Sequence, residues 1–260
     1  MSTKATIIIT AFNVPTETEA VSTASELVTA LNQSDADVIK LENNISIPSI
    51  ITLTDTTDAV LNLNGYGITY TGTETDYNMF KAGEGSSLTI MNGEIIGNGL
   101  GSTAETRRSV KSMAIQSTAS DITLSNVKIT GFDGAVKVSD EGNMIGDTIL
   151  RVIGCDIETV GTCILVKGNG ENTLTSTKLM IQDSNITSTE YIGVSGQGNT
   201  GRWGVECVIT NSTINGTYAA IYYPQQQSSM LIDNCKLNGD TGLVVKGSSV
   251  TVIDTEITAT

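Results

Sequence analysis

The 260-residue chain contains no histidine, and this absence excludes several kinds of chemistry at once. Zinc sites built on imidazole and nucleophiles activated by a histidine base both require that side chain. Cysteine is also scarce, and none of the spacings between Cys155, Cys163, Cys207 and Cys235 matches a pair of zinc ligands. We therefore expect no bound metal and no cofactor, and we interpret the four thiols as small buried hydrophobic groups.

Positive charge is limited as well. The 14 lysines and arginines stand against 28 aspartates and glutamates, which gives a formal net charge of −14. This charge disfavours a duplex nucleic-acid binder, whose affinity comes from neutralising phosphates, and it disfavours an anionic membrane surface. No apolar run approaches the roughly 18 residues of a membrane span, and the amino-terminal residues lack the apolar core of a secretion signal. We expect no nucleic-acid partner, no membrane insertion and no secretion signal in this chain.

A short pattern recurs along the chain and organises it. Its copies begin at Leu61, Leu88, Ile122, Leu150, Leu179, Cys207, Met230 and Val250. Positions one, three and eight are almost all aliphatic, which is typical of strands that direct alternate side chains into a core. Position five is always glycine, asparagine or aspartate, and these residues tolerate a left-handed backbone. It therefore predicts a tight bend at Gly65, Asn92, Asn126, Gly154, Asp183, Asn211, Asn234 and Asp254.

A second family of short strands follows most copies, so each coil of about 27 residues contributes strands on more than one side. Such a coil buries its apolar face only by stacking on its neighbours. The columns and the asparagine-rich bend resemble the right-handed parallel β-helix of the pectin-lyase-like superfamily, over roughly Val38 to Thr260. The resemblance implies an all-β solenoid of about eight coils, a fold found in phage spikes and fibres, surface adhesins and polysaccharide lyases. From the left-handed bend we also expect the side-chain amides of Asn126 and Asn211 to bond to the same position in adjacent coils.

Residues 1–37 are expected to precede the solenoid at 38–260 as an amino-terminal strand and capping helix. Thr23 and Glu26 form a capping-box pattern at the start of a helix that extends to about Asn32. Its apolar face is predicted to contain Ala24, Leu27, Val28 and Leu31. This face is expected to cover the first coil, because a solenoid needs a cap at an open end.

The last copy of the pattern reaches Thr260 with no helix after it. The inward residues Val250, Val252 and Ile257 are then exposed, together with unpaired strand edges. Either the natural chain continues or another subunit covers this end. Since phage spikes of the resembling architecture are commonly trimers, the resemblance implies a parallel homotrimer.

Aromatic and basic residues provide the candidate binding sites. Aligning the second strand family places at one outward position Lys81, Gln116, Lys137, Lys167, Ser195, Tyr223 and Lys246. A lysine stripe can hold an acidic polysaccharide or protein surface, or can simply keep the surface soluble. Aromatic rings can stack on sugars, although the single tryptophan can equally pack beneath its glycine-rich loop. The candidates for glycan contact are Trp203, Arg202, Tyr222, Tyr223, Lys137 and Lys167.

A second basic group lies in the longest insertion between copies. Arg107, Arg108 and Lys111 can bind a carboxylate or phosphate, or can be a solvated part of that loop. Carboxylates that could support catalysis are scattered, at Asp133, Asp140, Glu141, Asp156 and Glu158. Since acidic residues do not stack in one column of neighbouring coils, we assign no catalytic residue.

Two functions from different classes remain. The first is a non-enzymatic structural or adhesive β-helix, most simply a fibre, spike or head-surface protein of a phage virion that binds glycans. It implies a virion or extracellular surface location and a polysaccharide or virion-protein partner. The alternative is a polysaccharide lyase or glycoside hydrolase acting on an acidic polysaccharide.

Overall fold

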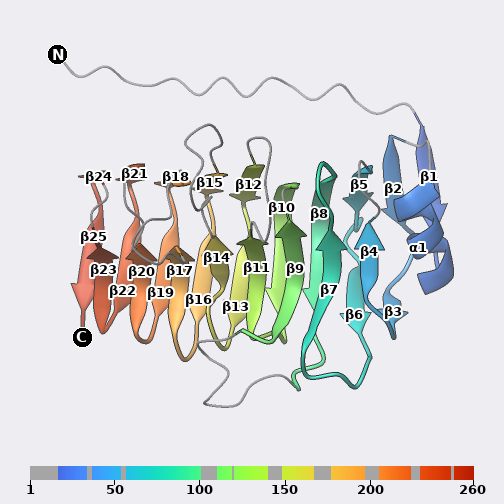
Figure 1. The fold of residues 1–260 in the computed structure, drawn as a ribbon, viewed down its shortest axis with the longest axis horizontal. Coiled ribbons are helices and arrows are strands. Elements are labelled where there is room, and N and C mark those ends of the chain that lie inside the picture. Colours follow the sequence, from blue (N-terminus) through green and yellow to red (C-terminus); the bar gives the residue numbers. More distant parts are fainter. Residues whose placement is uncertain are drawn as a thin grey trace.

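The computed structural model describes residues 17–33, 37–53, 57–100, 110–118, 120–139, 148–166, 177–196, 205–223, 229–246 and 249–260. These residues form a parallel β-helix that winds from the helix α1 at one end to β25 at the other (Figure 1). The described strand pairings are all parallel, and from β2 onward each joins one coil to the next. The predicted fold class is therefore confirmed.

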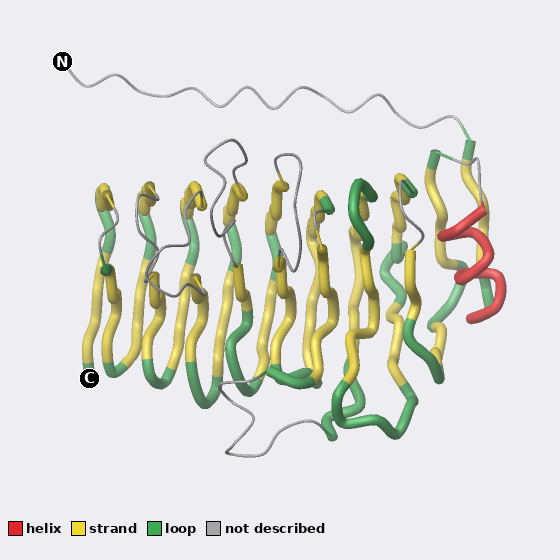
Figure 2. Tube along the Cα trace, viewed as in Figure 1, coloured by secondary structure: helices red, strands yellow, loops and turns green. Residues whose placement is uncertain are grey.

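The coils build a 17-stranded sheet and an eight-stranded sheet (Figure 2). The larger sheet bends along a line parallel to the rod, and β8 and β10 run through the bend. Its strands that precede or cross the bend are β1 (Thr18–Val21), β2 (Val38–Leu41), β5 (Asp58–Asn62), β8 (Ser87–Ile96), β10 (Asp121–Thr130), β12 (Thr148–Ile153), β15 (Thr177–Gln182), β18 (Val205–Thr210), β21 (Ser229–Asp233) and β24 (Ser249–Ile253). Its strands beyond the bend are β3 (Ile45–Ile47), β6 (Gly67–Tyr70), β13 (Asp156–Thr159), β16 (Asn185–Ser188), β19 (Thr213–Gly216), β22 (Lys236–Gly239) and β25 (Glu256–Ala259). The smaller sheet contains β4 (Ile51–Leu53), β7 (Tyr77–Ala82), β9 (Ser112–Thr118), β11 (Gly134–Ser139), β14 (Ile164–Val166), β17 (Ile192–Gly196), β20 (Ala219–Tyr223) and β23 (Thr241–Val245).

The interior is filled by the aliphatic positions of the repeat. Leu179, Ile181 and Ile186, at positions one, three and eight of one copy, are all buried. The same alternation recurs in neighbouring strands, so these columns were predicted correctly. In the last coil, Val252 and Ile257 are 41% and 45% exposed, because β24 and β25 each pair on one side only.

The helix α1 (Ala24–Gln33) lies over the first coil and contacts β1 to β5 (Figure 1). Its capping box is confirmed, since the Glu26 amide donates to Thr23 Oγ1 and the Thr23 amide donates to Glu26 Oε2. Leu27, Ala30 and Leu31 are buried. The prediction for Val28 was wrong, because the helix turns Ala30 to the core and leaves Val28 42% exposed. No helix in the described part of the chain is long and apolar enough to cross a membrane.

The bend column behaves as predicted. All eight residues at position five have positive φ, from 43° at Asp254 to 86° at Gly65. Asn126 Nδ2 donates to Asn92 Oδ1 at 3.4 Å, Asn211 Nδ2 to Asp183 Oδ1 at 3.0 Å, and Asn234 Nδ2 to Asn211 Oδ1 at 2.9 Å. We call this column of side chains the bend ladder. It is interrupted at Gly154, which has no side chain to bond.

Position six adds a second set of bonds that the sequence pattern did not reveal. The hydroxyls of Ser184, Ser212 and Thr255 each donate to the carbonyl two residues earlier, at 2.7 Å. The thiols of Cys155 and Cys235 make the same contact, at 3.4 and 3.2 Å. The carbonyls of Gln182, Thr210, Asp233 and Ile253 also accept the backbone amide of position five in the preceding coil, so position six supplies them with a second donor.

Candidate functional site

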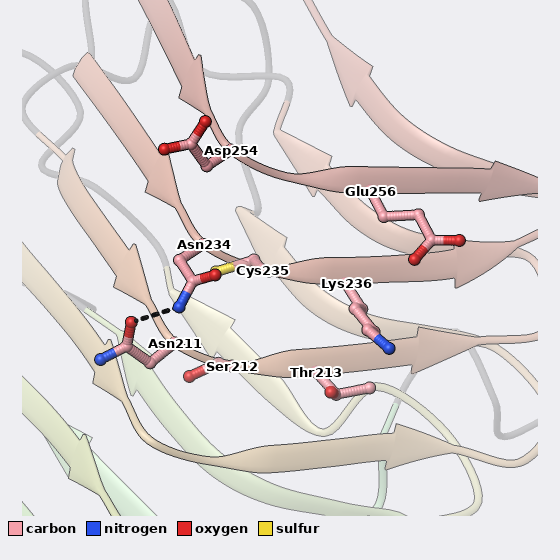
Figure 3. A pocket seen from close by; sticks show the side chains of 8 residues that line it. All are labelled: Asn211, Ser212, Thr213, Asn234, Cys235, Lys236, Asp254 and Glu256. Atoms are coloured by element: carbon pink, nitrogen blue, oxygen red, sulfur yellow. Dashed lines mark hydrogen bonds between the residues drawn. The ribbon is translucent and has the colours of Figure 1, made fainter.

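The bend creates a groove on the outside of the last three coils (Figure 3). It has a volume of about 290 Å³ and is lined by Asn211, Ser212, Thr213, Asn234, Cys235, Lys236, Asp254 and Glu256. The amide of Asn234 is bonded to Asn211 within the bend ladder (Figure 3). Cys235 is buried, and burial raises the pKa of its thiol, so it stays protonated near neutral pH. The groove thus offers hydroxyl, amide, ammonium and carboxylate groups for hydrogen bonding, but no activated nucleophile.

Position seven forms one side of this groove in the last three coils and carries charges of both signs along the solenoid. In strand register it reads Glu94, Lys128, Asp156, Asn185, Thr213, Lys236 and Glu256. Lys128 Nζ lies 3.9 Å from Glu94 Oε1, and Asn185 Nδ2 donates to Asp156 Oδ1 at 3.2 Å. Because neighbours along this column are complementary, it forms a cross-strand pairing ladder and not a cluster of carboxylates.

The predicted lysine stripe was wrong in register. Lys81, Gln116 and Lys137 do align, but the column continues through Leu165, Ser195, Tyr222 and Val244. Tyr223 points inward instead, is 1% exposed, and donates its hydroxyl to the Val205 carbonyl at 2.6 Å, so it cannot contact a glycan. Only two lysines therefore share this outward column in the described residues, and the argument for a polyanion stripe is lost.

A tyrosine cluster lies on the coils of β17, β20 and β23. Tyr191 and Tyr218 stack with ring centroids 5.5 Å apart and planes at 23°. Tyr218 is 49% exposed, and Tyr222 follows it four residues later on β20. Lys246 Nζ donates to the Tyr222 hydroxyl at 2.8 Å, and this bond, assisted by Tyr218, raises the pKa of the ammonium. We call Tyr191, Tyr218, Tyr222 and Lys246 the tyrosine face.

Of this face, the sequence reasoning named Tyr222 as a glycan contact and placed Lys246 in the stripe, but it missed the other two tyrosines. A signal was present, since Tyr191 and Tyr218 are 27 residues apart, which is one coil. Trp203, Arg202, Lys167, Arg107 and Arg108 lie outside the described residues, as do Asp140 and Glu141. Lys137 lies on β11, in a different coil from the tyrosine face.

The third member of the basic group, Lys111, is exposed, and its backbone amide donates to Asp133 Oδ2 at 3.2 Å. Asp133 itself is 2% exposed and also accepts from the Ser112 amide at 3.3 Å. Burial raises the pKa of this carboxyl, although the two amides act in the opposite direction. Because Asp133 holds the start of β9 in place, we interpret it as a structural group. Among the described residues, no three histidine, cysteine or acidic side chains gather as a metal site would require.

Comparisons with known proteins add little at the level of sequence. No protein-family model matches the chain, and a search of curated proteins finds no match. Solved structures that are similar in fold include a phage tailspike and an SRRP. The Dettilon tailspike protein (gp208) matches with 13% identity and a TM-score of 0.48, over 82% of this chain and 46% of the tailspike chain. The SRRP of L. reuters 100-23 matches with 13% identity and a TM-score of 0.42, over 96% of this chain and 100% of its own. The chain thus spans about half the length of the tailspike chain it matches.

Proposed function

We propose that this chain is a structural β-helix of a virion or cell surface that binds a glycan without cleaving it. The observation that carries the binding role is the tyrosine face. Aromatic residues are only 4% of the chain, yet three of its seven tyrosines gather here, beside an ammonium group. An exposed ring can pack against the apolar face of a sugar, while a hydroxyl and an ammonium donate to sugar oxygens.

The charge distribution favours a neutral glycan. The net charge of −14 repels polyanions at long range, and the corrected register leaves no lysine stripe to offset this. A neutral oligosaccharide avoids the repulsion and still uses the stacking surface of Tyr218. The alternative is a lyase or hydrolase acting on an acidic polysaccharide. Hydrolysis of a glycosidic bond requires two carboxylates at a defined separation.

A glycan array followed by titration calorimetry tests this proposal. We expect binding to neutral oligosaccharides that changes little with salt, and no release of unsaturated or reducing products. Tyr218→Ala is expected to weaken binding about tenfold, by loss of the stacking area. Lys40→Ala, on β2 at the other end of the solenoid, is the control and should leave affinity unchanged. Absence of glycan binding refutes the proposal, and product release supports the enzyme alternative in its place.

A further inference from the structure

The outer face of four neighbouring strands of the larger sheet carries equal numbers of basic and acidic side chains. On β12, β15, β18 and β21 alternate side chains point outward and are partly exposed. These outward residues include two basic ones, Arg151 and Lys178, and two acidic ones, Glu206 and Asp233. In a chain with a net charge of −14 this surface is neutral, and we call it the neutral face.

An apolar row runs through the middle of the neutral face. Met180, Val208 and Leu231 occupy one register column on β15, β18 and β21, and Arg151 precedes them on β12. Each of the three is only partly buried, although it is apolar. These three adjacent side chains offer an apolar strip on which another protein surface can pack.

We infer that the neutral face binds the same face of a second copy of this chain, around a twofold axis parallel to the strands between β15 and β18. Such an axis places β15 over β18 of the partner and β12 over β21 of the partner. Each register column of one copy then lies over the same column of the other copy. Met180 then lies opposite Val208 of the partner subunit, and the two rods run in opposite directions. Other self-pairings do not match the charges as well: a twofold axis along the rod places Arg151 opposite itself.

The charges of the neutral face are complementary under this operation. Lys178 and Glu206 share a column on β15 and β18. The Lys178 of one copy therefore lies opposite Glu206 of the partner subunit, and the reverse holds for the second copy. Arg151 lies over the partner's Leu231, and Asp233 is two residues further along that strand, about 6.6 Å away. An arginine side chain can span that distance between sheets packed about 10 Å apart. Each charged residue of the face therefore meets an opposite charge.

The overlap also sets the size of the contact. The axis superposes the strands from β10 to β24, which corresponds to on the order of 500 Å² of sheet per copy at ordinary strand spacing. This area is at the low end for specific interfaces, where weak and transient complexes are found. We therefore expect a dimer that dissociates on dilution.

Sedimentation velocity from low to high micromolar concentration tests the inference. Lys178→Glu and Glu206→Lys should each weaken dimerisation by at least about tenfold, because each places like charges opposite one another. An equimolar mixture of the two variants should restore the dimer as a heterodimer, since acidic and basic residues then face each other at both positions. Lys137→Glu, the same charge change on β11, is the control and should dimerise as the unmodified chain does.

The mixing experiment separates the interface from effects within one chain. Lys178 and Glu206 are also neighbours in their own sheet, so each single variant can lose some stability, but mixing cannot repair that loss. Recovery on mixing therefore supports the twofold contact. A monomer at all concentrations, a trimer, or single variants that dimerise normally would each overturn it.

Discussion

Replacing Asn211 in the bend ladder tests the physical account of the bend most directly. Its φ of 50° is in the left-handed region, which costs a β-branched residue about 1–2 kcal/mol. Its side chain donates to Asp183 Oδ1 at 3.0 Å and accepts from Asn234 Nδ2 at 2.9 Å. These bonds are exposed to water, so we assign them about 0.5 kcal/mol each. Asn211→Val should therefore lower the free energy of unfolding by about 2–3 kcal/mol.

Asn211→Gly separates the two contributions. Glycine adopts the left-handed backbone freely, so this variant loses the ladder bonds but carries no backbone strain. We expect it to cost about 1 kcal/mol, which is clearly less than the valine variant. Urea unfolding of both variants measures the difference.

Because coils can open locally, hydrogen exchange provides a second measurement. The backbone amide of Asn211 donates to the Asp233 carbonyl, and its protection should fall most in the valine variant. Equal destabilisation by glycine and valine would show that backbone strain contributes nothing. An unchanged midpoint for Asn211→Val would refute the whole account of the bend.

Three further predictions concern other parts of the coil. Cys235→Ser should leave the free energy of unfolding in urea nearly unchanged, because serine occupies the same position at Ser212. Cys207→Ser should lower it by about 1–3 kcal/mol, because it buries an unpartnered hydroxyl in the core. Burial raises the pKa of the Asp133 carboxyl above its unfolded value, so the folded state binds the proton more tightly. Lowering the pH through that pKa should therefore stabilise the native chain relative to Asp133→Asn. Parallel profiles of unfolding free energy against pH would contradict this. Gly154→Asn should raise the melting temperature, because its amide can donate to Asn126 Oδ1, which must shift to admit the new Cβ at 2.5 Å, and because it restricts the unfolded chain. Gly154→Ala, strained at φ 62° and without an amide, should lower it.

The sequence predicted those features of the fold that depend on the residue type at a single position, such as the bends. Position five needs a residue that accepts positive φ, so its column could be identified before any coil was placed. The second strand family has no such marker. Ile164, Leu165 and Val166 are all apolar, as are Leu243, Val244 and Val245, so alternation could not show which side faces the core. The prediction therefore placed Lys167 and Lys246 in the outward column, whereas the structure places Leu165 and Val244 there, two residues earlier in each coil.

The tyrosine face depends on contacts between coils, and a single repeat copy cannot show it. The direction of the neutral face, in contrast, follows from the repeat itself. Arg151, Met180, Val208 and Leu231 occupy position two of their copies, between the inward positions one and three, so alternation directs them outward. The structure adds that these residues share one register column and that the three apolar ones are only partly buried.

The mixture of asparagine, aspartate and glycine in the bend ladder follows from two separate requirements. The backbone needs positive φ, which all three residue types accept. The side-chain ladder needs a donor directed toward the preceding coil, and only asparagine supplies one. Asp183 follows Gly154, where no acceptor exists, so a residue that only accepts loses nothing there. The aspartate therefore begins the second part of the ladder, and the same reasoning explains why Asp254, which also lacks a donor, adds no bond to Asn234 in the last coil.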